Sequence, residues 1–494
     1  MADQHAQTMN EVTSPAWMVG VPPGLIDRST VDYEFQEYRN QSSNTSGATN
    51  YRLYTTDTTS YLYLPSAHLE VEFQIKASDS GVTAGNQTAL ASNGWSLFEN
   101  AKLKIGDELV AQLDKPAKAV HPRILAEYSR EYMQTVAQKS HHFCDEKSDL
   151  GDATTVDRVD GSAASADGTY PSGLYDEVQF LVSSNEITNV FANDNYDPAF
   201  RSKVNRCTAE GATGNGGDLN TIASTAAKQR ILLPLSEAFP LLGQYSRVVK
   251  GSKLEIELNK ISSAAEAVFG ATDTANVSVS ISEIALWVAR VKPSLSAMKL
   301  IESQIAESPV VNVNYHNMKY YSQTNVRSDN QGENTWTVTH KQNRPSHCYL
   351  FFQRVARDSN SNLNPLEFDY FSQINRVEMR INGRQVPHIA YTNDAQVDRA
   401  RIVHELQRIA GKDRDPADSC CVNYDSWGRN KALYGFDFSH LEGSAYESTS
   451  TAEIEVRWNQ SADTPSNYNV GLVMFSQANA LLDYSKGVTT LRLL

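Results

Sequence analysis

The sequence is poor in cysteine and contains no long hydrophobic run. Five cysteines in 494 residues, an odd and sparse set, are typical of a reducing compartment and argue against a disulfide framework. The most apolar stretch, residues 281–291, is interrupted by Ser282, Glu283 and Arg290, whereas a membrane span needs about 20 apolar residues. Residues 1–12 are polar, so no secretory signal is expected. We therefore expect neither a membrane protein nor a secreted one.

Basic residues are also too few for a protein that coats nucleic acid. The chain has 44 Lys and Arg against 58 Asp and Glu, a formal net charge of −14 at pH 7. Surfaces that coat phosphate are strongly basic, so sequence-specific contacts with nucleic acid are not expected. An acidic chain of this length fits a protein that repels non-specific nucleic acid and buries one or two full cores without metals or disulfides.

What the sequence does contain is a period of two. Residues 68–76 alternate, with Leu69, Val71, Phe73 and Ile75 on one face, as in an antiparallel strand with one wet side. The same alternation recurs in residues 253–258, 277–281 and 452–457. Because such patterns far outnumber helical ones, the predicted fold class is all-β.

Helical spacing occurs in two segments. The first follows Pro122, a residue type that suits the first turn of a helix, and its apolar stripe comprises Ile124, Leu125, Tyr128, Tyr132 and Val136. The second has Asn393 or Asp394 as its candidate N-cap and Gly411 as its stop, and its stripe comprises Ile402, Val403, Leu406, Ile409 and Ala410. We therefore expect two short amphipathic helices.

Three regions lack a regular period. Residues 1–50 contain Pro15 and Pro22 and are predicted to form an N-terminal arm. Residues 145–175 and 185–228 are rich in small and polar residues. Long irregular stretches in compact proteins are usually functional, partner-facing or disordered. Because strand patterns flank these two, we interpret them as loops that leave a β-scaffold.

The sequence contains an internal duplication. Residues 103–110 align without gaps on residues 379–386, an offset of 276 (379 − 103). Both segments carry a two-residue turn, Gly106-Asp107 and Asn382-Gly383, of the kind that needs positive φ in a tight hairpin.

Other landmarks keep the same order along the chain. Pro65 and Pro345, each predicted to open a strand, lie 280 positions apart. The two helical stripes are offset by 278 (402 − 124). Residues 255–257 then align with 453–455 at only 198, which leaves the first half an excess of 78 residues (276 − 198).

Each half therefore reads as one domain of many strands joined by turns. That size and pattern suit a two-sheet sandwich, with the jelly roll as the leading candidate. The predicted division is an arm at 1–50, a first jelly roll at 51–293 with insertions at about 145–175 and 185–228, a linker at 294–309 and a second jelly roll at 310–494.

Three pairs of motifs point to a known family. The segment 95–98 leads into the first hairpin and 368–371 into the second, while the strand motif at 231–239 has a candidate partner at 433–439. The chain thereby resembles double jelly-roll major capsid proteins of double-stranded DNA viruses, the lineage of adenovirus hexons and polinton-like viruses. The resemblance covers about residues 50–494.

The resemblance implies a structural role. Such proteins assemble as homotrimers, which form pseudo-hexagonal capsomers that tile an icosahedral shell. It also implies minor capsid and penton proteins as partners, the virion as the location, and synthesis in the cytoplasm or nucleus of the host cell. A chain without a basic tail fits a shell that does not itself condense the genome.

No catalytic or metal-binding constellation is complete in the sequence. His404 and Glu405 match a helical zinc-protease motif, but Arg408 stands where its second histidine belongs. Metal-ligand types also gather at 141–145, which contains His141, His142, Cys144 and Asp145, yet no second cluster completes a four-coordinate site.

Weaker signals have simpler explanations. The glycines within 211–217 do not form a phosphate loop, and residues 413–418 lack the spaced oxygens and closing Glu of a calcium loop. The vicinal pair Cys420-Cys421 is either a redox pair or, more simply, two half-buried side chains. We therefore predict no enzyme, no catalytic, cofactor-binding or metal-binding residues, and no cofactor.

Two alternatives remain open. Glu255/Glu257 and Glu453/Glu455 are carboxylate pairs, and 23 Tyr and 6 Trp would suit glycan stacking as well as protein interfaces, so a β-sandwich carbohydrate-binding protein or glycoside hydrolase is one alternative. Strand alternation explains these pairs without chemistry, because such residues share the wet face. A viral spike or minor capsid protein is the other alternative.

Overall fold

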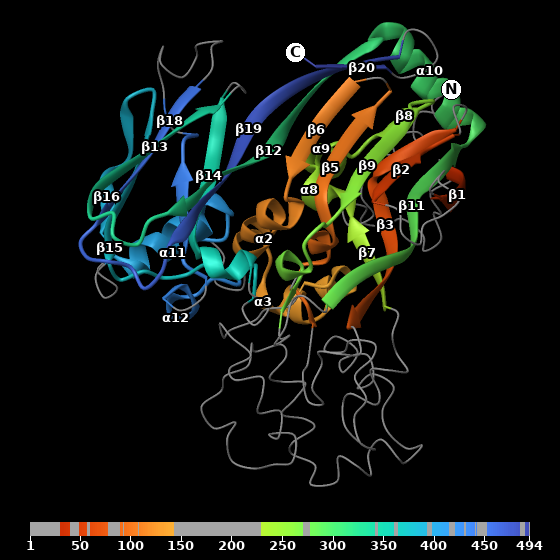
Figure 1. Ribbon diagram of the computed structural model, residues 1–494. Coiled ribbons are helices and arrows are strands. Elements are labelled where there is room, and N and C mark those ends of the chain that lie inside the picture. Colours follow the sequence, from red (N-terminus) through yellow and green to blue (C-terminus); the bar gives the residue numbers. More distant parts are fainter. Residues whose placement is uncertain are drawn as a thin grey trace.

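The fold is seen in a computed structural model (Figure 1). It describes residues 30–39, 49–56, 60–77, 89–91, 93–106, 108–142, 229–269, 277–340, 344–359, 364–392, 398–413, 420–428, 431–439, 441, 452–484 and 490–493. The two predicted loops at 145–175 and 185–228 lie outside these residues, as does most of the predicted arm.

The first half of the chain forms two antiparallel sheets, at the right of Figure 1. The sheet called here the first outer sheet has the order β1 (Thr30–Arg39), β11 (Val277–Pro293), β3 (Tyr61–Ala77) and β7 (Gln229–Pro234), with β8 (Val248–Lys250) also paired to β3. The facing sheet has the order β2 (Asn50–Tyr54), β9 (Leu254–Lys260), β5 (Phe98–Ile105) and β6 (Glu108–Asp114).

The second half repeats this arrangement at the left of Figure 1. The second outer sheet has the order β12 (Val310–Val326), β19 (Tyr468–Asp483), β14 (Pro345–Arg354) and β17 (Leu433–Asp437), with β20 (Thr490–Leu493) paired to β19. Its facing sheet has the order β13 (Gly332–His340), β18 (Ala452–Gln460), β15 (Ile374–Ile381) and β16 (Arg384–Thr392).

Both halves have the strand order of a jelly roll. The principal strands of each half can be numbered from one to eight along the chain. In both halves one sheet then has the strand order 1-8-3-6 and the other has the order 2-7-4-5. The count leaves out β8, β20 and the short pair β4 (Ala89–Leu90) and β10 (Val268–Phe269). Two four-stranded sheets with this order form the double-sheet jelly roll. The predicted strand partners overlap β7 (segment 231–239) and contain β17 (segment 433–439), and these two strands occupy the same place in the two halves.

The strand ladders correct one step of the sequence alignment. Leu103 pairs with Ile256, and its counterpart Met379 pairs with Val456. The offset in this strand is therefore 200 (456 − 256), whereas the sequence aligned Ile256 with Ile454 at 198. The alignment error is two residues, which is one full period of a strand. A shift of two keeps every side chain on the same face of the sheet, so the hydrophobic alternation could not reveal it.

The two hairpins follow the prediction. Gly106 has φ +65°, and Asn382 and Gly383 have φ +48° and +82°. Positive φ at both central positions of the second turn gives the twist that a two-residue hairpin needs.

The first predicted helix begins earlier than expected. Helix α2 (Pro116–Glu127) starts with Pro116 at its first turn, so Pro122 lies inside the helix. Helix α2 ends at Glu127, with Tyr128 in an extended conformation. Ser129 then caps α3 (Arg130–Gln134) by accepting a hydrogen bond from the Tyr132 backbone amide at 3.1 Å. Pro116 and Pro122 are six residues apart, and Pro116 occupies the first-turn position predicted for Pro122.

The second predicted helix, α11 (Arg399–Ile409), begins after Asp398, so the predicted N-caps Asn393 and Asp394 are wrong. The Asp398 carboxylate accepts hydrogen bonds from the Thr392 backbone amide and hydroxyl, both at 2.7 Å, which fixes the entry to the helix. The stop is confirmed: Gly411 has φ +71° and donates to the Arg408 carbonyl.

Two elements differ from the predicted arm and linker. Residues 30–39, placed in the arm, form strand β1. The linker contains helix α10 (Leu295–Glu307), which Ser294 caps by accepting a hydrogen bond from the Ala297 amide at 3.3 Å. The division into separate domains stays a prediction.

Short elements complete the described fold. They are η2 (Gly94–Leu97), η3 (Val136–Ser140), α8 (Leu235–Ala238), α9 (Pro240–Gln244), η7 (Ala264–Glu266), η9 (Val355–Asp358) and α12 (Tyr424–Trp427). Buried residues of both halves form one contiguous hydrophobic cluster, so the two sandwiches contact each other through apolar side chains. That contact decides which sheet faces are available to a partner.

Candidate assembly surfaces

The outward face of the second outer sheet is aromatic and dry. Along β14, Cys348 points inward and its thiol contacts Met379 of the facing sheet, so Tyr349 and Phe351 point outward. Both outward rings are nevertheless buried, with exposed fractions of 0% and 1%. Gly471 on the neighbouring strand leaves room for Phe351, because a Cβ there would lie 2.2 Å from its ring. This face is therefore covered tightly by another part of the chain.

Elements of the first half provide the cover, as Figure 1 shows for α2 and α9 beside β12 and β19. Lys118 of α2 is buried; its ammonium donates to Gln353 at 2.8 Å and also contacts Asp358. His121 of α2 packs on Phe368, with ring centroids 5.7 Å apart. Further ties are Gln244 to His316, Tyr245 to Tyr484 and the Cys421 amide to the Leu125 carbonyl.

Histidines at this junction are held neutral by burial. Burial lowers the pKa of His121 to about 3, with smaller effects from the charges of His142 and Lys431. Burial also lowers the pKa of His347 to about 3, and His316 is shifted in the same direction. A charged imidazole would lose its hydration here, and the nearby carboxylates of Glu127 and Asp437 offset only part of that loss for His316 and His347, so the junction favours the neutral form.

The equivalent face of the first outer sheet is open. Val31, Tyr33 and Phe35 alternate along β1 and are 65%, 51% and 48% exposed. The rings of Tyr33 and Phe35 lie 5.8 Å apart, and Phe35 also contacts His68 at 5.7 Å. On the inward face of β1, Tyr38 is buried, whereas Asp32 and Glu34 nearer the start of the strand are exposed. A row of exposed aromatic side chains on one strand is typical of an interaction surface.

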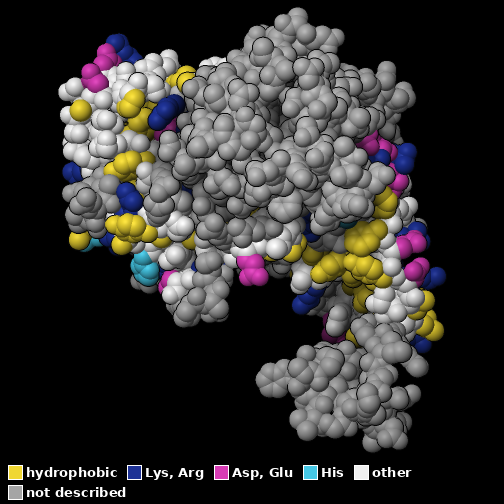
Figure 2. All heavy atoms as spheres, turned by 90° about the horizontal axis from the view of Figure 1, so that it is seen from below, with side chains coloured by type: hydrophobic (Ala, Val, Ile, Leu, Met, Phe, Trp, Pro, Cys, Tyr) yellow, Lys and Arg dark blue, Asp and Glu magenta, His cyan; other side chains and the backbone are white. Residues whose placement is uncertain are grey.

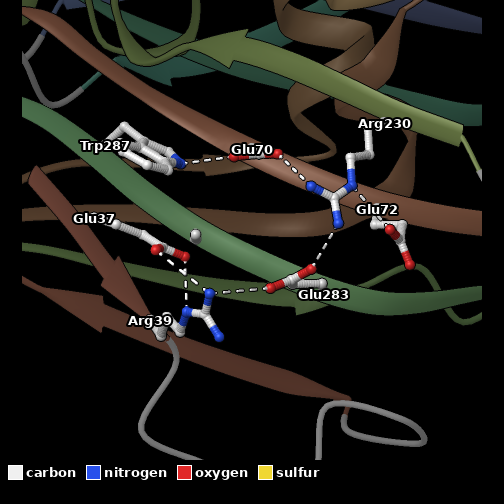
Figure 3. A pocket seen from close by; sticks show the side chains of 8 residues that line it. Glu37, Arg39, Glu70, Glu72, Arg230, Glu283 and Trp287 are labelled. Carbon is white, nitrogen blue, oxygen red and sulfur yellow. Dashed lines mark hydrogen bonds and ion pairs between the residues drawn. The ribbon is translucent and has the colours of Figure 1, made fainter. Parts of the chain in front are cut away.

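A charged cluster continues this open face (Figure 3). Arg230 binds three carboxylates from two strands, those of Glu70 at 3.0 Å, Glu72 at 2.9 Å and Glu283 at 3.1 Å. Arg39 of β1 binds Glu37 at 2.7 Å.

These side chains, with Trp287, line a hollow of about 170 Å³. We call Glu37, Arg39, Glu70, Glu72, Arg230, Glu283 and Trp287 the first-sheet charge cluster. On the underside of the molecule, charged side chains of both signs likewise border hydrophobic ones along the margin of the first half, at the right of Figure 2.

The candidates from the sequence lie elsewhere and do not come together. Glu405 on α11 is bound by Arg408 at 2.9 Å, and His404 is exposed. His142 contacts the buried Glu237 carboxylate at 3.0 Å, and His141 contacts the Leu90 carbonyl at 3.2 Å. Glu405, His141 and His142 are thus each bound to a structural partner. Cys144, Asp145, the glycines of 211–217 and residues 414–418 lie outside the described residues.

Of the four paired carboxylates, Glu255 is buried, which corrects the expectation for that residue; Glu257, Glu453 and Glu455 are exposed or partly exposed, as expected. Glu255 is 2% exposed beneath Arg52 and Lys253. Burial alone would raise the pKa of its carboxyl, but hydrogen bonds from those two side chains outweigh burial and lower it to about 2. Glu257 is partly exposed and binds Lys104 at 2.5 Å. A carboxylate held ionised by two cations is suited to stabilising a sheet and not to acid–base chemistry.

The vicinal cysteines Cys420 and Cys421 lie buried where the second half contacts α2. Cys420 and Cys421 are both buried and unbonded to each other, and burial raises the pKa of the Cys420 thiol. The Cys420 thiol contacts the Val422 carbonyl, while the Cys421 backbone joins the second half to α2. Among the described residues no group of His, Cys, Asp or Glu is arranged to hold a metal, and no helix is long and apolar enough to span a membrane.

The comparisons with known proteins rest on structure. No family model matches the sequence, and no curated protein sequence matches it. A chain in the cryo-EM structure of the Sputnik virophage matches with a TM-score of 0.56 and 11% identity, over 98% of this chain and 92% of that one. The mavirus major capsid protein matches with a TM-score of 0.50 and 12% identity, over 98% and 94%. The chain therefore has the fold of these viral proteins, all-β with two tandem jelly rolls, as the sequence predicted.

Proposed function

We propose that the chain is the major capsid protein of a double-stranded DNA virus, which assembles as homotrimers and then as an icosahedral shell. The fold supports this, since it is shared with the mavirus major capsid protein over nearly the whole of both chains. The observation that best supports self-assembly is the difference in exposure between the outward faces of the two outer sheets. One is covered by the chain itself, while the equivalent one exposes aromatic side chains beside the first-sheet charge cluster.

Symmetry explains why three copies suit such a chain. Two similar jelly rolls per chain give six per trimer, so a nearly hexagonal unit follows from threefold symmetry. The proposal includes minor capsid and penton proteins as further partners, the virion as the location and the host cytoplasm or nucleus as the place of synthesis. It includes no enzymatic step, and the structural partners of Glu255, Glu405 and His142 support this.

Mass photometry and negative-stain electron microscopy of the purified full chain test the proposal. We expect a trimer of three-lobed or hexagonal outline at micromolar concentration, with larger arrays at higher concentration. A stable monomer under these conditions would contradict it. A monomer that binds one sugar saturably in a glycan screen would instead favour the carbohydrate-binding alternative.

A further inference from the structure

The covering elements of the first half have counterparts in the second. Helix α2 follows β6, and α11 follows β16 at the same place, so that the offset of 278 aligns Arg123 with Arg401. Helix α2 and strand β6 both lie against β12 of the second outer sheet, and α2 also contacts β19. The side of the first jelly roll that carries α2 and β6 is therefore the side that covers the outer sheet of another jelly roll.

The counterpart of that side is exposed. We call β16, Asp398 and α11 together the α11–β16 side. Ile389 on β16 is 68% exposed, and His404 on α11 is exposed as well. Its charged residues at neutral pH are Arg384, Arg399, Arg401 and Arg408 against Asp398 and Glu405, a net charge of +2 (4 − 2). Asp437 of the adjacent β17 binds Arg408 at 2.8 Å and reduces the net charge presented here to +1 (4 − 3).

The open face of the first outer sheet complements this side in two ways. The first-sheet charge cluster has two arginines and four glutamates, a net charge of −2 (2 − 4). The exposed rings of Tyr33 and Phe35 supply an apolar area next to it, which matches the exposed Ile389. Opposite charge with an apolar centre is the usual composition of a specific protein interface.

We infer that the open face of the first outer sheet binds the α11–β16 side of a second copy of this chain. The inference rests on the proposed function and names the partner surface for it. The contact inside the chain is its template: in each case the helix and hairpin side of one jelly roll covers the outer sheet of the next. Such a contact is head-to-tail, so three chains close a ring in which each outer sheet is covered.

Two single variants and their mixture test the inference. Tyr33→Asp disables the open face, and Ile389→Asp disables the α11–β16 side; both positions are at least half exposed, so the fold should survive. Val136→Asp, at a 47% exposed position on η3 outside both surfaces, is the matched control. Mass photometry gives the oligomeric state, and circular dichroism with a melting curve checks folding. If Tyr33→Asp fails to fold, Phe35→Ser on the same face replaces it.

Each variant alone should be monomeric, whereas the control should assemble as the native chain does. An equimolar mixture should give a capped heterodimer and no trimer, because only one intact pair of surfaces remains. Trimers formed by either single variant, homodimers of one variant, or a mixture that stays monomeric would overturn the inference. If the native chain itself fails to assemble, the proposed function fails first, so the two failures are distinguishable.

Discussion

The two outer sheets have the same strand order but opposite surroundings. The outward face of the second is made of buried aromatic rings such as Phe351, whereas that of the first carries exposed rings such as Phe35 and a network of ion pairs. Since the duplicated sandwich builds both sheets, the difference does not come from the fold of either half. It comes from what the other half covers, and it separates a surface that stabilises the chain from one available to a partner.

The largest expected effect breaks the covered face. Phe351→Ala should lower the free energy of unfolding by about 3–5 kcal/mol, since it removes a buried ring and leaves a cavity that Gly471 cannot fill. Phe35→Ala on the open face should change it by less than about 0.5 kcal/mol. Urea unfolding followed by tryptophan fluorescence measures both. Equal losses would mean that the open face is as tightly packed as the covered one.

A second prediction compares two arginines that each bind several carboxylates. Arg357 is 1% exposed and binds Asp369 at 2.8 Å and Glu367 at 2.8 Å. Arg357→Met takes this shared cation away from two buried carboxylates, of which Asp369 keeps its contact with Arg354 at 3.3 Å, and should cost about 3 kcal/mol. Arg230 is largely exposed, so Arg230→Met should leave the melting temperature unchanged while it weakens trimers. Differential scanning calorimetry and mass photometry give the two readouts. A stable Arg357→Met variant would contradict the burial argument.

The third prediction concerns pH. The pKa of His121 and His347 is lowered to about 3 in the folded chain, well below the unfolded value of 6.5. Above pH 6.5 both histidines are neutral in the folded and the unfolded chain, so they leave the free energy of unfolding unchanged. As the pH falls from 6.5 toward the folded pKa values, the unfolded chain binds protons that the folded chain does not. The free energy of unfolding then falls by roughly 1.4 kcal/mol per pH unit for each histidine. Below about pH 4.5 protonation of Glu255, whose folded pKa is about 2, adds to the loss.

Urea midpoints between pH 7 and 4.5 measure this slope. His347→Phe should flatten it, because a phenyl ring keeps the stacking on Phe475, whose ring lies 4.4 Å away, and does not titrate. His404→Gln, at an exposed position, should leave the slope unchanged. An unchanged slope in His347→Phe would show that the junction does not exclude the charged form.

The smallest expected effect tests where the two halves agree. Gly106 and Gly383 occupy equivalent hairpin turns with φ +65° and +82°, and a Cβ at either would meet no other atom within 4 Å. Gly383→Ala and Gly106→Ala should therefore each cost about 1 kcal/mol through backbone strain alone. Thermal melts of the two variants should be displaced alike. A much larger loss in one half would show that its turn has an additional role.

Much of the fold could be predicted because its signals are local. The hairpin glycines and the stop at Gly411 act within a few residues, and both were confirmed. Helix starts were harder, since Pro116 and Pro122 both suit a first turn and only packing against η2 and α8 selects the earlier one. Helix α10 was missed although Ser294 is a good N-cap and its 13 residues exceed the 11 of α11; none of these residues is buried.

By itself the sequence determined the all-β class, the duplication and the alternation that gives each sheet an inward face. The sequence also indicates a difference between the two outer sheets. Residues 348–352 are continuously apolar, as in a strand buried on both faces, whereas residues 68–76 alternate. Only the tertiary structure decided which outer sheet is covered. Periodicity reports that a side chain is buried but not by what, and here the covering residue, Lys118, lies 235 positions from its partner Gln353.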